Sequence, residues 1–128
     1  MSKGIITLCG STRFFKLFDE INYKLTMADY IVLSIGCHTN HDACLGISEI
    51  DNAIEMLDRL HKEKIMHSDG VVILDKDGYI GKSTESELKY AIQLGKPVYY
   101  YNDGTYKWLL EHSIQSRELT IIPLDKKN

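Results

Sequence analysis

The sequence predicts an α/β fold, a three-layer sandwich in which helices cover both faces of a parallel β-sheet. Short, nearly continuous apolar runs alternate along the chain with longer segments whose apolar residues recur at helical spacing. Strands of a parallel sheet are buried on both faces, so they read as unbroken apolar runs. The 128 residues, 44% of them hydrophobic and 26% charged, suffice for a single domain, 1–128, with a sizeable core.

Apolar runs predict five strands, at 5–9, 30–35, 70–74, 98–101 and 119–122. Their alternation with helical segments favours a flavodoxin-like or Rossmann-like sheet with the order 2-1-3-4-5. Ligands of such sheets bind beyond the carboxyl ends of the strands, near the switch point between strands 1 and 3. The loops expected to meet there are 10–13, 36–46 and 75–83.

Three longer segments predict helices, and a short helix is expected at 106–112. The first helix carries an apolar stripe with spacings of four, three, four and three: Phe14, Phe18, Ile21, Leu25 and Ala28. The second begins near Ser48 or Asp51, either of which can cap it, and its apolar face holds Ile50, Ile54, Leu57 and Leu60. The third covers about 84–94 and ends at Gly95 and Pro97.

Charge and cysteine content narrow the class of protein. The formal net charge is −3 with both signs interspersed, so no broad nucleic-acid-binding surface is expected. The apolar runs are too short for a signal peptide or a membrane span. Three cysteines without C-x-x-C spacing fit a reducing cytoplasm better than a disulfide framework. We therefore expect a cytoplasmic protein without nucleic-acid or membrane partners.

The loop after the first strand has the groups needed to hold a phosphate or a sugar. Backbone N–H groups, two hydroxyls and a guanidinium occur together, and the expected substrate-binding residues are Cys9, Gly10, Ser11, Thr12 and Arg13. The alternative is a plain strand exit in which Ser11 or Thr12 caps the next helix. The loop matches neither G-x-G-x-x-G nor G-x-x-x-x-G-K-[ST], which disfavours a dinucleotide oxidoreductase and an ATPase.

A second such loop, 78–87, joins the third strand to the third helix. Glycines and hydroxyls precede Glu87, whose carboxylate can act as a nucleophile or base and is expected to stay ionised because of the helix dipole. The competing interpretation is a capping box, Thr84-x-x-Glu87. The further expected substrate-binding residues are Gly36, Tyr79, Gly81, Ser83 and Thr84.

Two residues of the second helix are candidate catalytic groups. His61 lies within its apolar stripe, where a satisfied core histidine is the commoner outcome, and Asp58 flanks that stripe. Either can supply a general acid or an orienting group. The loop sequence Cys37-His38-x-x-His41-x-x-Cys44 has residue types that suit zinc, but four ligands in one short loop are unusual, so no metal is expected.

Three stretches resemble the nucleoside 2-deoxyribosyltransferase superfamily, including its nucleoside 5′-monophosphate N-glycosidase branch. They are I-T-L-C-G-S-T-R at 6–13, S-D-G-V-V-I-L at 68–74, and G-K-S-T-E-S-E at 81–87 with G-K-P-V at 95–98. The chain is also similar to small bacterial and phage proteins with a G-Y-I-G-x-S-T-x-S-E loop. In this resemblance Glu87 falls on the family's catalytic glutamate. The chain departs at two places: Thr7 and Leu8 stand where a tyrosine is usual, and His61 stands near the usual aspartate.

The resemblance implies cleavage of an N-glycosidic bond, or base transfer, on a nucleoside 5′-monophosphate or a (deoxy)nucleoside. Glu87 would be the nucleophile of such a hydrolase or transferase, no cofactor would be needed, and the protein would be a homo-oligomer. The departures motivate a second hypothesis, a module that binds a nucleotide without turnover. A glycohydrolase acting on NAD is a third, since it uses the same chemistry.

Overall fold

The computed structural model describes residues 1–35 and 47–102, without the side chains of 47–52. Four parallel strands form a sheet with the order β2-β1-β3-β4: β1 (Ile5–Cys9), β2 (Ile31–Leu33), β3 (Gly70–Ile73) and β4 (Val98–Tyr100). The α-helices of this part are α1 (Phe15–Met27), α2 (Ile47–Met66) and α3 (Lys82–Gln93). The predicted α/β class is confirmed, and the parallel sheet is compatible with a Rossmann-like fold.

The sheet differs from the expected one in its number of strands. The described residues contain four strands, so the order is β2-β1-β3-β4 and not the predicted five-stranded 2-1-3-4-5. The expected strand at 119–122 and helix at 106–112 lie outside the described residues. The second strand is also shorter than predicted, because the residues that pair with β1 are Ile31 to Leu33.

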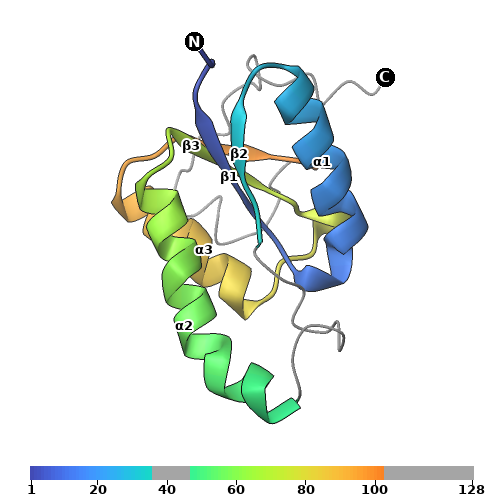
Figure 1. The fold of residues 1–128 in the computed structure, drawn as a ribbon, viewed down its shortest axis with the longest axis vertical. Helices are drawn as coiled ribbons and strands as arrows, with labels where there is room; N and C mark the ends of the chain where they lie inside the picture. The colour runs from blue at the N-terminus through green and yellow to red at the C-terminus, as the bar shows by residue number, and fades with distance from the viewer. Residues whose placement is uncertain (36–46, 103–128) are drawn as a thin grey trace.

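Helices cover the sheet on both faces, which gives three layers. Figure 1 shows α1 on one side of the strands and α2 with α3 on the other. On the first side, α1 packs its predicted apolar stripe on alternate strand residues, including Ile6, Leu8 and Val72. On the second side, Leu88 and Ala91 of α3 and Ile65 of α2 pack on Cys9, Val71 and Ile73. The period of two along β1 therefore turns Cys9 toward α2 and α3.

The ends of β1 and β3 lie close together because Gly10 follows β1. A Cβ atom on Gly10 would lie 3.0 Å from Leu74 Cβ and 3.5 Å from Phe18 Cε2, so a side chain there would push the two strand ends apart. The pairing of Cys9 with Ile73 continues this contact into the sheet. The loops after β1 and β3 consequently begin side by side.

Among residues 1–35 and 47–102, we find no helix with the length and apolar character needed to cross a membrane.

Packing of α3 on the sheet can be tested with Leu88→Ala. Leu88 is fully buried, so we expect a loss of about 2–5 kcal/mol in the free energy of unfolding, measured by urea denaturation. Leu94→Ala is the control, because Leu94 ends the same helix and is 40% exposed; it should cost about 0.5 kcal/mol or less. Equal losses in the two variants would contradict this packing.

Candidate functional site

A cavity of about 470 Å³ lies where the end of β1, the start of α3 and one face of α2 meet. Ser11 and Thr12 line it from the β1 loop, and Ser83, Thr84 and Glu87 line it from α3. The other lining residues are Gly10, Ile35, Ile54, Leu57, Asp58, Leu60, His61, Lys64, Gly81 and Lys82. This is the carboxyl edge of the sheet beside the switch point, where ligands of open α/β sheets bind.

A larger hollow, about 810 Å³, lies on the other side of α2 and shares Asp58 with this cavity. Most of its lining side chains are exposed, among them Glu55, Met56, Arg59 and Glu63. Buried titratable groups line the smaller cavity instead, namely His61 and Glu87. We therefore place the candidate site in the smaller cavity.

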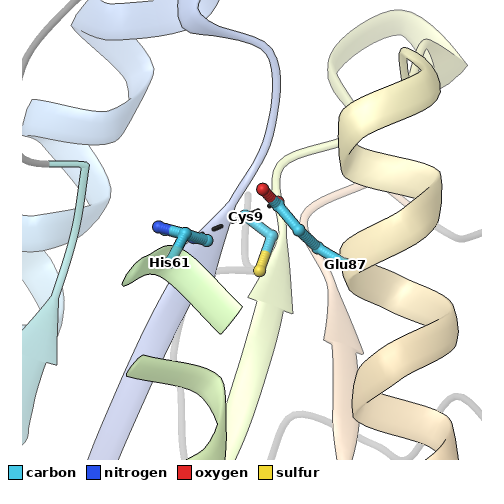
Figure 2. Close-up of side chains that lie close together, drawn as sticks. All are labelled: Cys9, His61 and Glu87. Carbon is cyan, nitrogen blue, oxygen red and sulfur yellow. Dashed lines mark ion pairs between the residues drawn. The ribbon is translucent and has the colours of Figure 1, made fainter. Parts of the chain in front are cut away.

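Glu87 lies in the second turn of α3, with its carboxyl group almost withdrawn from solvent. The residue is 8% exposed. The buried Cys9 thiol of β1 donates a hydrogen bond to the carboxylate. On the other side, His61 Nε2 lies 4.0 Å from Glu87 Oε1 (Figure 2). Three segments far apart in the sequence thus meet at one carboxyl group.

The capping-box interpretation of Glu87 is wrong. The residue that caps α3 is Gly81, which has an extended backbone and no side-chain cap hydrogen bond. Thr84 already lies inside the first turn and is 1% exposed. Glu87 is therefore too far along the helix to bond back to the cap, and its carboxyl group faces the cavity instead.

The expectation that Glu87 stays ionised is also wrong. Burial, and second the charge of nearby Asp58, raise the pKa of Glu87 to about 8. Lys62 and the hydrogen bond from Cys9 act in the opposite direction but are outweighed. A carboxyl group with this pKa is about nine-tenths protonated at pH 7. The field of the α3 N-terminus fades within the first turn and does not offset the desolvation.

His61 is a neutral, hydrogen-bonded histidine. Its Nε2 lies 2.9 Å from the carbonyl oxygen of Leu8, and because a carbonyl can only accept, Nε2 carries the proton. Burial, and second the charge of Lys64, lower the pKa of His61 to about 4. The contact with Glu87 has ion-pair distance but joins two largely uncharged groups at neutral pH. His61 therefore orients the site, and its Nε2 proton is already engaged.

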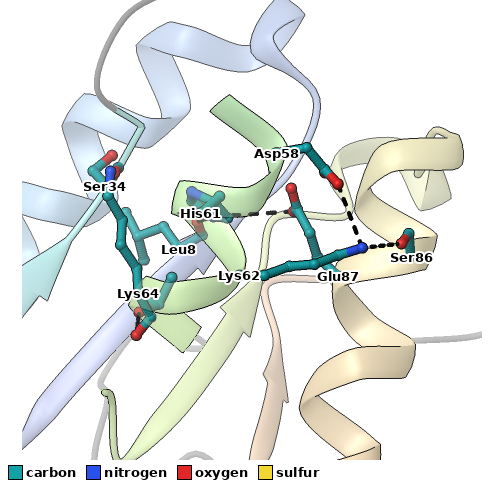
Figure 3. Close-up of polar contacts among 9 residues, drawn as sticks. Leu8, Ser34, Asp58, His61, Lys62, Lys64, Ser86 and Glu87 are labelled. Carbon is teal, nitrogen blue, oxygen red and sulfur yellow. Dashed lines mark hydrogen bonds and ion pairs between the residues drawn. The ribbon is translucent and has the colours of Figure 1, made fainter. Parts of the chain in front are cut away.

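Asp58 belongs to a small polar network that connects α2 to α3. Lys62 Nζ lies 3.4 Å from Asp58 Oδ2 and donates a 2.8 Å hydrogen bond to Ser86 Oγ (Figure 3). The network brings one negative and one positive charge near Glu87, with opposite effects on its pKa. Neither Lys62 nor Ser86 was identified from the sequence as part of the site. The i, i+4 spacing of Asp58 and Lys62 was the available signal.

Three of the expected substrate-binding residues do not line the cavity. Cys9 is fully buried behind Glu87 and supports its carboxyl group. Arg13 lies 4.2 Å above the Tyr79 ring, and Arg13 Nη2 donates a 3.4 Å hydrogen bond to Tyr79 Oη. A Cβ on Gly81 would lie 3.1 Å from that same hydroxyl, so glycine lets Tyr79 approach the start of α3. Gly36, together with the loop cysteines and histidines at 37–44, lies outside the described residues.

The described cluster offers donors of the kinds that bind metals. Cys9 Sγ, a ring nitrogen of His61 and a carboxylate oxygen of Glu87 all lie within 4.8 Å of one another. Without a metal, the same cluster presents the Glu87 carboxyl group, which can donate a hydrogen bond when protonated or attack an electrophile when ionised.

Comparison with models of known protein families finds no match to this chain, and comparison with curated protein sequences finds none either.

The buried carboxyl group predicts a pH dependence of stability. A carboxyl whose pKa is higher in the folded protein stabilises the fold at low pH and loses this contribution as pH rises through its folded pKa. The lowered pKa of His61 affects stability mainly below pH 6.5, where it makes the folded protein less stable as the pH falls. From pH 6.5 to 8.5, Glu87 therefore dominates, and the wild type should lose roughly 2 kcal/mol.

Glu87→Gln should remove most of this loss, as measured by urea denaturation across that pH range. The control is Glu85→Gln on the same helix, where the carboxylate lies 3.6 Å from Lys89 Nζ on the outer face. This variant should show the same pH dependence of stability as the wild type. Parallel curves for the wild type and Glu87→Gln would contradict the raised pKa.

Proposed function

We propose that the chain cleaves the N-glycosidic bond of a nucleoside 5′-monophosphate or a (deoxy)nucleoside, with Glu87 as the nucleophile and with water or a second base as acceptor. The observation that supports this most is the position of the Glu87 carboxyl group. It lies buried on the wall of a cavity between the β1 exit and the start of α3. The sequence resemblance around 6–13, 68–74 and 81–98 supports the same assignment, and with it a five-stranded sheet and a homo-oligomer.

The proposed chemistry proceeds in two displacements. An ionised Glu87 oxygen attacks C1′ of the sugar, the C1′–N bond breaks, and the base leaves with its electron pair and takes a proton. The transition state is oxocarbenium-like, so a negative oxygen beside it is stabilising. Water then attacks C1′ and releases the carboxylate, or the nitrogen of a second base does so in a transfer. Configuration at C1′ is retained.

The leaving base needs a proton. Asp58 is the negative partner of Lys62 and carries no proton of its own, but its carboxylate can orient the water molecule that supplies one, and it fits this position better than His61. Asp58 lines the cavity, whereas the Nε2 proton of His61 is already donated to Leu8. Lys62, 3.4 Å from Asp58, connects the aspartate to Ser86 of α3. In this account His61 holds the β1 exit and the α2 face at the correct separation.

A substrate phosphate would sit at the other end of the cavity. Ser11, Ser83 and Lys82 line that region, and the first turn of α3 offers backbone N–H groups without intrahelical acceptors. Arg13 is held by Tyr79 next to this end, where it adds positive charge without lining the cavity. These groups favour a 5′-monophosphate over an uncharged nucleoside.

A second candidate function is nucleotide binding without turnover. It is favoured by the protonation of Glu87, whose pKa of about 8 leaves a neutral carboxyl group at physiological pH. A neutral carboxyl group donates and accepts hydrogen bonds to a ligand but attacks poorly. In that case a nucleotide would be recovered unchanged after binding.

The catalytic proposal is tested by base release. The wild type is incubated with ribo- and deoxyribonucleoside 5′-monophosphates, the matching nucleosides and NAD, with and without an acceptor base, and free base is followed by liquid chromatography. Glu87→Gln should lower release by roughly a thousandfold or more, because it removes the nucleophile. Glu85→Gln should leave it unchanged. Absence of release from every substrate, together with tight nucleotide binding, would replace catalysis by the binding function.

The pH dependence of kcat/KM tests the role of Glu87 within the catalytic proposal. A nucleophile must be ionised, so kcat/KM should rise with pH and level off above about 8, following the pKa of Glu87. Lys62→Met should move this rise to higher pH, because Lys62 lowers that pKa. Lys24→Met is the matched control, since Lys24 pairs with Glu20 at 3.1 Å on α1. Activity that falls above pH 8 would instead make Glu87 a general acid.

A further inference from the structure

The buried cluster beneath the cavity combines three different metal-binding side chains. Cys9 comes from β1, His61 from α2 and Glu87 from α3, and their donor atoms all lie within 4.8 Å of one another. Figure 2 shows Cys9 lying between His61 and Glu87. None is a surface residue, because their exposed fractions are 0%, 7% and 8%. The cluster therefore differs from exposed acidic clusters, in which carboxylates often lie close together by chance.

Thiolate sulfur, imidazole nitrogen and carboxylate oxygen are the donors that Zn²⁺ uses in proteins. One divalent cation with one thiolate and one carboxylate is electrically neutral, which suits a buried position. His61 and Glu87 also line the cavity, so a coordination position can face the space where a ligand would enter.

Hydrogen bonds now engage the donor side chains of this cluster. The thiol proton lies between Cys9 and Glu87, and the Nε2 proton lies between His61 and Leu8. On metal binding, Cys9 releases its proton, Glu87 releases one if protonated, and the His61 proton moves from Nε2 to Nδ1. The His61 ring must also turn so that Nε2 points away from the Leu8 carbonyl, because a cation about 2 Å from Nε2 on the present N–H line would collide with that oxygen. Metal–ligand bonds of about 2.0–2.3 Å require donors roughly 3.3–3.8 Å apart. The 4.0 Å between His61 Nε2 and Glu87 Oε1 would therefore contract by less than about 1 Å.

We propose that Cys9, His61 and Glu87 form a binding site for a zinc-class divalent cation, with a further coordination position open to the cavity. The binding itself does not depend on the proposed glycosidase function. If that function holds, the metal-bound form is inactive, because the metal engages the carboxylate that would attack the sugar.

The test is a titration of the reduced full-length protein with Co²⁺, followed by displacement with Zn²⁺. We expect a thiolate-to-cobalt charge-transfer band in the ultraviolet and the visible d–d bands of four-coordinate cobalt. Cys9→Ala should abolish the charge-transfer band. Glu87→Gln should keep it but weaken Co²⁺ binding at least about tenfold, because one ligand is lost. This second variant keeps the test informative if Cys9→Ala does not fold.

The control is the double variant Cys37→Ala, Cys44→Ala, which removes the thiols of the other cysteine- and histidine-containing segment and should leave the band unchanged. Absence of a charge-transfer band in the wild type would overturn the proposal. So would a band that survives Cys9→Ala but disappears in the double variant. Base release is measured separately, so failure of the glycosidase function and failure of the metal site give different results.

Discussion

The desolvation of a single carboxyl group governs the chemistry of this site. Glu87 is turned inward from α3 onto the end of β1, where the hydrogen bond from the Cys9 thiol and the opposing charges of Asp58 and Lys62 set its protonation. His61 lies beside it but gives its Nε2 proton to the Leu8 carbonyl. Because burial outweighs the attraction of Lys62, the neutral acid is favoured at physiological pH. Three packed elements bring these groups together: β1 supplies Cys9, α3 supplies Glu87, and α2 supplies Asp58, His61 and Lys62.

The same carboxyl group has three chemically distinct states, and each supports a different capability. Protonated, it can hold a nucleotide by hydrogen bonds. Ionised, it can attack C1′ of a sugar on the cavity side. Bound to a cation together with Cys9 and His61, it is a metal ligand. The oxocarbenium-like transition state can favour the ionised state, because it brings a developing positive charge next to the carboxylate. Because the pKa of Glu87 is about 8, both the protonated and the ionised form are populated near neutral pH.

Sequence patterns predicted the framework well because the elements follow from local periodicity. The stripe from Phe14 to Ala28 and the apolar runs at 5–9 and 70–74 correspond to α1, β1 and β3. Topology rules then correctly predicted that Ser11, Ser83 and Glu87 would line one cavity.

The errors of prediction came from tertiary effects. Thr84 and Glu87 have capping-box spacing, but the helix begins two residues earlier than Thr84. The ionisation of Glu87 depends on burial, which residues next to it in the sequence do not determine. The Lys62–Ser86 contact joins two helices, so it cannot be predicted from local sequence either. The stacking of Arg13 on Tyr79 is likewise a contact between distant loops.

The most direct test of this account is the protonation of Glu87 itself. Carbon-13 labelling of the glutamate carboxyl carbons, with the Glu87 signal assigned by its loss in Glu87→Gln, allows its titration to be followed by nuclear magnetic resonance. We predict a transition of the Glu87 signal near pH 8, well above the ordinary range of a glutamate carboxyl group. A transition of Glu87 at the ordinary glutamate pKa of about 4.3 would show that its carboxyl group is solvated or paired with a cation, and would contradict the account.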